Sequence, residues 1–388
     1  MLSLNKISIS VLTFFMFLCF LFCGSMPICY SKVDDSGIKS SVLIEYDTGK
    51  ILSENNMSAK MPIASVTKLM TILLVLERVD EGNLDLEKLV TASENAAKMG
   101  GSQVFIEKGG EYKVLDLLKA TIISSANDAS VMLAEEVSGS EKEFVNKMNQ
   151  KAEQIGLKNT HYVNSTGLPA PMQYSSAEDV ALVMREVLKH PLYLKLSSIW
   201  MENFSHPKGR VTTMSNTNKL LKSYDLCDGG KTGSTAEAGF CLCATAKKGD
   251  MRLISVVLGA GTSKTRFEES KKLFEYGFNN FEKTKLVDSS KDLGEGVTIQ
   301  KAAKDSIILH SERDFCVVTK KGDESSFSAE LIVDKVIFAP IKAGEKVGVI
   351  KLMENNCVID EIAVIVGEDV NAVGYYQTIQ HIIKRWLI

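Results

Sequence analysis

The residues best suited to chemistry in this chain are a hydroxyl and an amine, Ser65 and Lys68, within the stretch Pro62–Met70. Apolar residues recur at helical spacing from 66 to 76, and a proline is typical of a first helical turn, so we expect the pair at the start of a buried helix. Residues three apart lie on one helical face, which makes the two side chains neighbours. Burial disfavours the charged form of a lysine, and a neutral Lys68 could deprotonate Ser65.

The Ser-x-x-Lys pattern is weak evidence by itself, because it occurs again at Ser36 to Lys39 and at Ser205 to Lys208. Ser65 differs in its context. It begins a long hydrophobic helix, whose first-turn N–H groups and dipole stabilise negative charge. The matches at Ser36 and Ser205 lack such a helix.

A second polar group, Ser125-Ala-Asn127, follows a predicted buried helix at 114–123. Asp128 is then a candidate N-cap for a helix at 129–137. The simplest alternative is that the group only caps that helix. Ser-x-Asn also occurs at Ser53 and Ser93, so this tripeptide is not specific alone.

Lys231-Thr-Gly233 is a third group, and no other Lys-Thr-Gly or Lys-Ser-Gly occurs in the chain. Strand-like runs follow at 240–246 and 252–259, which predicts the edge of an antiparallel sheet. A glycine in a strand lets another backbone approach, as a bound peptide substrate would require. The alternative for Lys231 is an ordinary surface turn.

The surrounding pattern predicts a mixed α/β (α+β) domain followed by a β-sandwich. A hairpin at 41–46 and 50–52 precedes the Ser65 helix, and an irregular loop at 161–174 lies between two predicted helices. Those helices are at 144–157 and 176–189. After residue 281 short strands with regular turns indicate a small sandwich. They are expected at 296–299, 306–310, 315–319, 329–333, 335–338, 347–352 and 358–366.

Composition limits the classes of function. A chain of 388 residues that is 45% hydrophobic is globular and long enough for two domains. Its 45 basic and 48 acidic residues give a net charge of −3, which argues against a nucleic-acid partner. The eight cysteines are scattered. Cys241 and Cys243 share one face of a strand and are expected as small core residues, and no histidine stands at ligand spacing, so no metal site is expected.

The first 31 residues are expected to be a signal peptide, because Lys6 precedes an apolar run at 7–23 that ends in small residues. The alternative is an uncleaved membrane anchor, since the run is close to the length that spans a bilayer. A lipoprotein is less favoured, because Phe22 is large for the position before a lipidated cysteine.

The last segment, 370–388, is expected to be an amphipathic helix that lies on the membrane surface. Tryptophan and basic residues at the C-terminus of an exported protein favour this reading. The alternative is a helix docked on the sandwich. The apolar stripe consists of Ile379, Ile382, Ile383 and Trp386, and the polar side carries His381, Lys384 and Arg385.

In their order along the chain, the three groups resemble the active-site serine penicillin-recognising family, whose signature combines Ser-x-x-Lys, Ser-Asp-Asn and Lys-Thr-Gly. This chain departs from the second motif at Ala126. Ala126 between Ser125 and Asn127 looks more like the low-molecular-mass D-alanyl-D-alanine carboxypeptidases (peptidase S11) than the β-lactamases. The likeness extends over roughly residues 38 to 388, judged by motif order. It includes Pro62–Thr71, Ser125–Ala129, Gly156–Leu168 and Tyr276–Phe278.

The resemblance implies catalytic roles for Ser65, Lys68 and Ser125, and substrate-binding roles for Asn127, Lys231, Thr232, Gly233 and Ser234. Ser65 would be the acylated nucleophile, Lys68 its general base, and Ser125 a proton relay to the leaving D-alanine. Asn127 would bind the substrate amide. Lys231 and Thr232 would bind the terminal carboxylate, and the backbone N–H groups of Ser65 and Ser234 would form an oxyanion hole.

The implied protein is an exported serine-type carboxypeptidase, peripheral to the extracytoplasmic face of the membrane or secreted, that trims D-Ala-D-Ala stem peptides of peptidoglycan. It would need no cofactor, and β-lactam antibiotics would acylate and inhibit it. We expect the catalytic domain at 38–281, the sandwich at 285–367 and the membrane helix at 370–388.

Three alternatives remain open from the sequence. A β-lactamase needs a positioned carboxylate for deacylation, but 164–172 contains none, and Glu178 is more simply a first-turn helix acid. A transpeptidase would use the same acyl-enzyme. A catalytically silent cell-wall binding protein would keep the fold alone.

Overall fold

The structure is a computed structural model that describes residues 37–294, 297–302, 306–323 and 326–374. The expected signal peptide lies outside the described residues, and so does most of the expected tail helix. Its first residues, 370–374, are described and are not helical: Val370 forms a β-bridge with Ile341, and Ala372 with Ala302. Val370 is buried among apolar side chains, and that burial accounts for its place against the β-structure.

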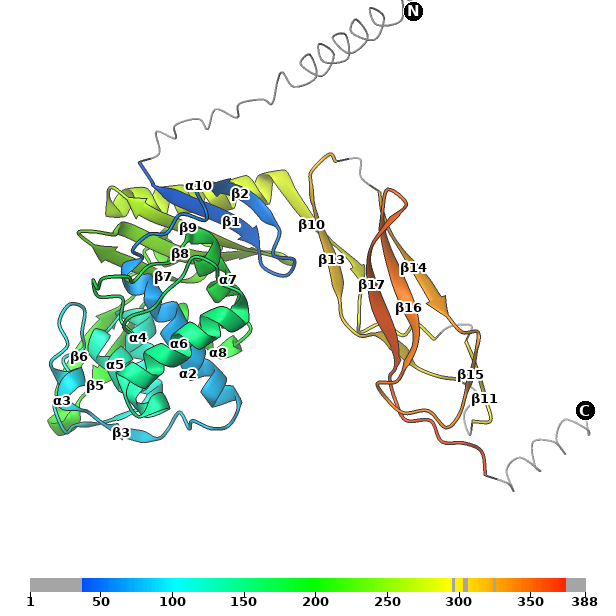
Figure 1. The fold of residues 1–388 in the computed structure, drawn as a ribbon, viewed down its shortest axis with the longest axis horizontal. Coiled ribbons are helices and arrows are strands. Elements are labelled where there is room, and N and C mark those ends of the chain that lie inside the picture. The colour runs from blue at the N-terminus through cyan, green and yellow to red at the C-terminus, as the bar shows by residue number, and fades with distance from the viewer. Residues whose placement is uncertain (1–36, 295–296, 303–305, 324–325, 375–388) are drawn as a thin grey trace, which may run out of the picture. The chain divides into compact units, whose positions relative to one another are not determined.

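A five-stranded antiparallel sheet organises the first part of the chain (Figure 1), in the order β2-β1-β9-β8-β7. The predicted hairpin is confirmed as its first two strands, and Lys231–Gly233 lies in an edge strand as expected. The strands are β1 (Ser40–Glu45), β2 (Ile51–Asn55), β7 (Cys227–Thr235), β8 (Gly239–Lys248) and β9 (Met251–Ala260).

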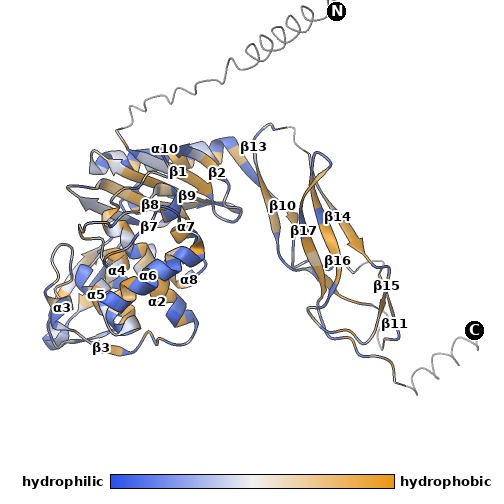
Figure 2. Ribbon diagram, in the orientation of Figure 1, coloured by the Kyte–Doolittle hydropathy of each residue, from blue (hydrophilic) through white to orange (hydrophobic). Residues whose placement is uncertain are grey.

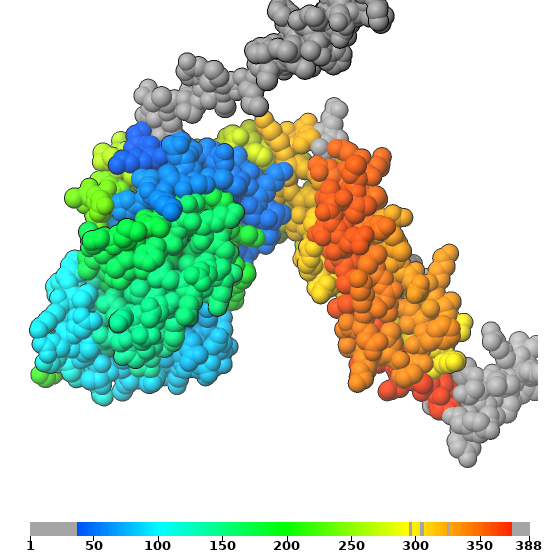
Figure 3. Space-filling model, viewed as in Figure 1, coloured from blue at the N-terminus to red at the C-terminus, as the bar shows by residue number. Residues whose placement is uncertain are grey.

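Helices cover both faces of this sheet (Figure 1). Helix α10 (Ser263–Asn280) packs on one face, against β8 and β9, and α7 (Ala177–Val187) packs on the other. In Figure 3 the atoms of the first strands, in blue, lie directly against the green helical region. The remaining longer helices are α2 (Lys68–Asp80), α4 (Val114–Ile123), α5 (Asn127–Ser138), α6 (Glu141–Ile155) and α8 (Pro191–Ser197).

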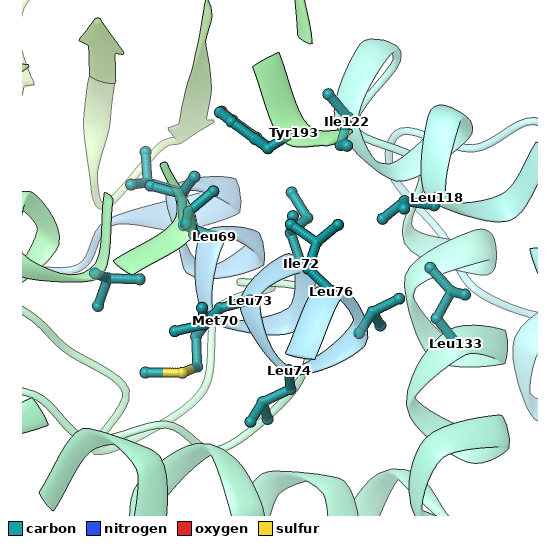
Figure 4. Packing of buried hydrophobic residues seen from close by; sticks show 14 of the residues in the cluster. Leu69, Met70, Ile72, Leu73, Leu74, Leu76, Leu118, Ile122, Leu133 and Tyr193 are labelled. Carbon is teal, nitrogen blue, oxygen red and sulfur yellow. The ribbon is translucent and has the colours of Figure 1, made fainter. Parts of the chain in front are cut away.

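Helix α2 forms the centre of the helical layer. Nine of its residues are buried, from Lys68 to Leu76, and α4, α5 and Tyr193 of α8 surround it (Figure 4). Apolar colour accordingly marks the middle of α2, whereas the outer helix α6 shows a polar face (Figure 2). Burying so many apolar side chains fixes α2, and with it the position of its N-terminal residue, Lys68.

The start of this helix differs from the prediction. A 3₁₀ turn, η1 (Ala64–Thr67), precedes α2, so Ser65 lies in the 3₁₀ turn and Lys68 begins the α-helix. Ala64 has a φ of +48°, and its neighbour Ile63 makes no side-chain cap. The chain therefore enters the helix through a turn that is strained at Ala64, just before Ser65, and such strain persists only where the surroundings enforce it.

Asp128 is not the N-cap that the sequence suggested. Helix α5 already begins at Asn127, and Ala126 is its cap position without a side-chain bond. The Asp128 carboxylate instead accepts hydrogen bonds from the backbone N–H groups of Val104 and Ile106. A buried carboxylate needs such donors, and the loop before β4 supplies them.

Short elements complete the first part of the chain, and the predicted helices α6 and α7 are confirmed with serine N-caps at Ser140 and Ser176. The short elements are β3 (Leu89–Thr91), α3 (Glu94–Ala97), β4 (Glu111–Lys113), β5 (Met201–Ser205), η2 (Pro207–Gly209), β6 (Val211–Ser215) and α9 (Leu220–Ser223).

The chain after residue 280 is β-structure, as predicted. One sheet has the order β12-β17-β16-β14, and two further pairs, β10-β13 and β11-β15, share its apolar core. In the described part of the chain, no helix has the length and hydropathy needed to cross a bilayer. The strands are β10 (Phe281–Val287), β11 (Thr298–Gln300), β12 (Leu309–Ser311), β13 (Phe315–Lys320), β14 (Phe327–Val333), β15 (Val336–Phe338), β16 (Lys346–Glu354) and β17 (Cys357–Val366).

Candidate active site

Two glycines hold the turn that carries Ser65. A Cβ on Gly167 would lie 2.0 Å from the carbonyl oxygen of Ala64, and a Cβ on Gly233 would lie 2.5 Å from that of Ile63. Neither position tolerates a side chain without displacing backbone. The Ser65 turn therefore packs against edge strand β7 and against the 164–168 loop.

The close approach at Gly233 corrects part of the sequence interpretation. The backbone that needs the missing side chain is the protein's own Ile63–Val66 segment, because the Gly233 Cβ would also lie 3.0 Å from the Ser65 nitrogen. Gly233 thus places the N–H of Ser65 beside the sheet edge. The neighbouring Ser234 is exposed at that edge.

Lys68 lies completely buried beside Ser65. Its Nζ is 3.0 Å from Ser65 Oγ, and it donates to Asn127 Oδ1 and to the Thr166 carbonyl, both at 2.6 Å. Burial, and secondly the charge of Lys231, hold the pKa of Lys68 well below its ordinary value, while Asp128 opposes this shift. The expected contact of Ser65 with an amine of reduced proton affinity is present.

Ser125 and Lys231 form a second hydroxyl–amine pair. Lys231 Nζ donates to Ser125 Oγ at 2.7 Å and to the Thr232 carbonyl at 3.0 Å. Ser125 has a φ of +61°, which is strained for a residue with a side chain. Burial, followed by the charge of Arg266, lowers the pKa of Lys231 to about 7.

Asn127 connects Lys68 to the loop that precedes β4. Its Oδ1 accepts from Lys68, and its Nδ2 donates to the Gly100 carbonyl at 2.7 Å. Its backbone N–H donates to the carbonyl of Ser102. The structure thus brings Ser125 and Asn127 to Lys68 and Lys231, as the spacing and order of the motifs led us to expect.

Thr232 lies in the same strand as Lys231, and its hydroxyl donates to Thr217 Oγ1 at 2.7 Å. Thr217 itself is held by a backbone bond to the Ile123 carbonyl at the end of α4. Sequence reasoning did not identify Thr217, which follows a short hairpin and belongs to no recognisable motif.

Two other contributors were also missed. The Thr166 carbonyl binds Lys68, and Arg266 of α10 donates to the Gly233 carbonyl. The 164–168 stretch did carry a signal, because it was part of the family resemblance. Arg266 carried none, since one arginine in a charged helix is indistinguishable from a surface residue.

The same region offers little to a metal ion or to an alternative base. Among the described residues, no group of three or more His, Cys, Asp or Glu side chains could hold a metal. Glu178 is in the first turn of α7, as predicted, and its carboxylate accepts from Ser58. Cys241 and Cys243 are buried in the core, which confirms their predicted role.

Comparisons with known proteins place these features in a family. A family profile described as D-alanyl-D-alanine carboxypeptidase matches residues 30–262. A second profile, described as the C-terminal domain of penicillin-binding protein 5, matches residues 281–372. The two matches correspond to the mixed α/β part and the β-rich part of the chain.

Relatives and solved structures agree with the profiles. D-alanyl-D-alanine carboxypeptidase DacF of Bacillus subtilis (strain 168) is 40% identical over 349 residues, which cover 90% of each protein. Penicillin-binding protein 5 of Haemophilus influenzae has a TM-score of 0.70 and 34% identity, covering 86% of this chain and 98% of its own. Penicillin-binding protein D2 of Listeria monocytogenes, in its ampicillin-bound form, has a TM-score of 0.57 and 33% identity, covering 62% and 98%. This chain therefore belongs to the D-alanyl-D-alanine carboxypeptidases of peptidase family S11, which are hydrolases.

Proposed function

We propose that this carboxypeptidase removes the terminal D-alanine from peptidoglycan stem pentapeptides through an acyl-Ser65 intermediate. The observation that carries the proposal is the 3.0 Å contact of Ser65 Oγ with the wholly buried amine of Lys68. A hydroxyl needs an adjacent base to become a nucleophile, and a lysine can serve once its pKa is lowered.

The other contacts of Lys68 orient it for this task. A neutral amine has two N–H donors and one lone pair. Asn127 Oδ1 and the Thr166 carbonyl accept the two hydrogens, and the lone pair then faces Ser65, whose hydroxyl becomes the donor. Ser65 can therefore attack the carbonyl carbon of the penultimate D-alanine while its proton passes to Lys68.

The backbone N–H groups of Ser65 and Ser234 would stabilise the oxyanion that forms. Support comes from Gly233, whose missing side chain allows the Ser65 nitrogen to approach strand β7. Preorganised donors of this kind act on charge that develops only in the transition state, and loss of one typically costs about two to three orders of magnitude in rate.

Lys231, Thr232 and Ser125 would act on the leaving residue. Lys231 and the Thr232 hydroxyl bind the terminal carboxylate, a charge-assisted contact that selects a free chain end. The carboxylate restores the positive charge of Lys231, because a nearby anion raises an amine pKa. Ser125, held by Lys231, relays a proton to the nitrogen of the departing D-alanine as the peptide bond breaks. The Asn127 amide binds the substrate amide.

Water then hydrolyses the Ser65 ester and regenerates the hydroxyl. A β-lactam would acylate the same serine, in keeping with the ampicillin-bound form of the Listeria relative. We favour slow rather than β-lactamase-like deacylation, because 164–172 contains no carboxylate and Glu178 is engaged by Ser58. The intact set of hydroxyls and amines argues for catalysis rather than wall binding alone.

The test is the Ser65→Ala variant, assayed for D-alanine release from a defined pentapeptide and for covalent labelling by a fluorescent penicillin. Both should disappear, since no acyl ester can form. Ser205→Ala is the matched control, because Ser205 belongs to another Ser-x-x-Lys pattern but lies in strand β5. Ser205→Ala should behave as the unmodified protein. Persistent labelling of Ser65→Ala would overturn the assignment.

We also propose that the protein is exported and that its signal peptide is removed. The support is the tripartite sequence of the first 31 residues, together with the similarity to D-alanyl-D-alanine carboxypeptidases, whose proposed substrate here lies outside the cytoplasm. Intact-mass measurement of the exported protein should show the loss of the N-terminal segment. Retention of residues 1–24 would instead indicate an uncleaved anchor.

The C-terminal sequence supports peripheral membrane attachment as a further proposal. Its apolar stripe and basic side are typical of interfacial helices. Truncation before Gln377 should release the protein from vesicles that contain anionic lipid, while D-alanine release remains. Undiminished vesicle binding after truncation would show that attachment, if any, lies elsewhere in the chain.

A further inference from the structure

Arg266 is a buried cation without a carboxylate partner among the described residues. It is only 8% exposed, and burial lowers its pKa. Its Nη1 donates to the carbonyls of Gly233, at 3.0 Å, and Cys241, at 3.2 Å, while Nη2 donates to Ser263. A buried charge held only by neutral groups is costly, so its position calls for an explanation.

The carbonyl of Gly233 belongs to the peptide group that joins Gly233 to Ser234. The N–H of that same group is the Ser234 donor of the proposed oxyanion hole. In a trans peptide the C=O and N–H point in opposite directions. A guanidinium bound to this oxygen therefore lies behind the donor, on the side away from the substrate.

We propose that Arg266 is a positioning residue for the oxyanion, which orients and polarises the Gly233–Ser234 peptide so that the Ser234 N–H becomes a stronger donor. The inference rests on the proposed oxyanion hole and adds a residue that acts through it. A hydrogen bond to a peptide oxygen strengthens the bond made by the same peptide's N–H, and a charged donor strengthens it further.

The surroundings of Arg266 hold its guanidinium in this place. Its Cζ lies 4.8 Å from the ring centre of Phe267 and 5.4 Å from that of Phe240. Aromatic faces favour a guanidinium and keep water from it. Burial, and secondly this fixed charge, lowers the pKa of Lys231.

A purely structural role is the competing explanation. The pairing of β8 with β9 shifts between Phe240 and Leu242, and Arg266 binds the carbonyl of Cys241 at that irregularity. If Arg266 only secured this bulge, its loss would lower stability. The loss of Arg266 would then not selectively weaken the binding of an oxyanion in the active site.

Arg266→Gln and Arg266→Lys distinguish the two roles, with Lys264→Gln as the matched control. Lys264 is on the same helix, and its side chain is 82% exposed and forms an ion pair with Glu268. We expect Arg266→Gln to lower kcat for D-alanine release about 10-fold, less than the loss of a whole donor, with KM nearly unchanged. Arg266→Lys keeps the charge but not the forked donor geometry, so it should restore only part of the rate, and Lys264→Gln should have no effect.

A peptide boronic acid gives a second readout, because its tetrahedral adduct with Ser65 places an oxygen in the oxyanion hole. Its affinity should fall by about the same factor as kcat, as expected for a transition-state analogue. Infrared spectra of the penicilloyl-Ser65 ester should show the carbonyl stretch at higher frequency in both Arg266 variants, including Arg266→Lys if Arg266→Gln does not fold.

Two results would overturn the role of Arg266. One is an unchanged kcat and boronate affinity per folded molecule, and the other is a raised KM with kcat unchanged. An unshifted ester frequency in Arg266→Lys would do the same. The proposed function itself is judged separately by Ser65→Ala. An inactive Ser65→Ala together with unaltered Arg266 variants would reject only the present inference.

Discussion

Two lysines in one site have different tasks because their surroundings differ. Lys68 is completely buried at the start of α2, and burial, with the charge of Lys231 as a second cause, favours its uncharged form. Lys231 lies at a sheet edge, and its pKa of about 7 leaves it close to half-charged at neutral pH. A bound substrate carboxylate favours the protonated, charged form of Lys231. Lys68 acts as a base in its uncharged form and needs no such partner.

The pH dependence of kcat/KM should report the protonation state of Lys231. We predict that kcat/KM for a peptide with a free carboxylate falls as the pH rises through about 7, because Lys231 then loses the proton that binds the carboxylate. The profile of kcat/KM reports the free enzyme, so the unliganded pKa applies. Lys231→Arg should move this limb to higher pH. A peptide amidated at its C-terminus should lack the limb, and an identical limb for both peptides would exclude the carboxylate contact.

At the scale of elements, the nucleophile depends on a turn held between two backbones. Gly167 and Gly233 allow the 164–168 loop and strand β7 to approach the η1 turn from different sides. The loop is itself fixed, since Glu141 accepts from both the backbone and the hydroxyl of Ser165. Rigid neighbours of this kind explain how a strained φ at Ala64 is maintained.

Gly167→Ala tests this packing, with Gly156→Ala as the matched control. Both glycines have positive φ, +81° and +84°, but only at Gly167 would a Cβ meet backbone. We predict that Gly156→Ala costs about 1 kcal/mol in the free energy of unfolding and Gly167→Ala about 2–4 kcal/mol. Denaturant unfolding measures both.

Acylation by a fluorescent penicillin should slow in Gly167→Ala only, because Ala64 and Ser65 must shift. Equal effects of the two substitutions on stability and acylation would show that conformational strain, rather than the contact with the Ser65 turn, dominates at Gly167.

At the scale of the whole molecule, every residue of the proposed site lies between Ser65 and Arg266, and the carboxypeptidase profile ends at residue 262. The β-rich part after residue 280 has its own apolar core. None of the contacts described for the site involves a described residue of this part. We propose the limits 38–281 for the catalytic domain and 285–367 for the β-sandwich.

A protein truncated after residue 281 should therefore keep its carboxypeptidase activity. We predict kcat and KM for a soluble pentapeptide within about twofold of the full chain, because the acylating and carboxylate-binding groups are retained. Activity on intact peptidoglycan provides the comparison. A large loss of kcat on the soluble peptide would mean that the second domain is needed to build the site.

Much of this organisation could be predicted from the sequence. Hydrophobic periodicity located α2, α4, α6 and α7, and strand-like runs located β8 and β9. The predictions were wrong at element ends: Asp128 does not cap α5, and the 370–374 segment is bridged rather than helical. Local patterns report how a segment buries its apolar face. The residue at which a helix or strand begins or ends depends instead on distant donors and acceptors that bind its terminal backbone groups.

The sequence by itself determined which chemical groups are available, because motif order and helical spacing placed Ser65 beside Lys68 and named Ser125, Asn127 and Lys231. Only the tertiary structure decided what surrounds them. The Thr166 carbonyl on Lys68, the two glycines against the Ser65 turn and Arg266 behind the Gly233–Ser234 peptide are contacts across many residues of sequence. Such contacts have no local pattern, because backbone carbonyls are present in every residue and become specific only when folding aims them at one amine or one guanidinium.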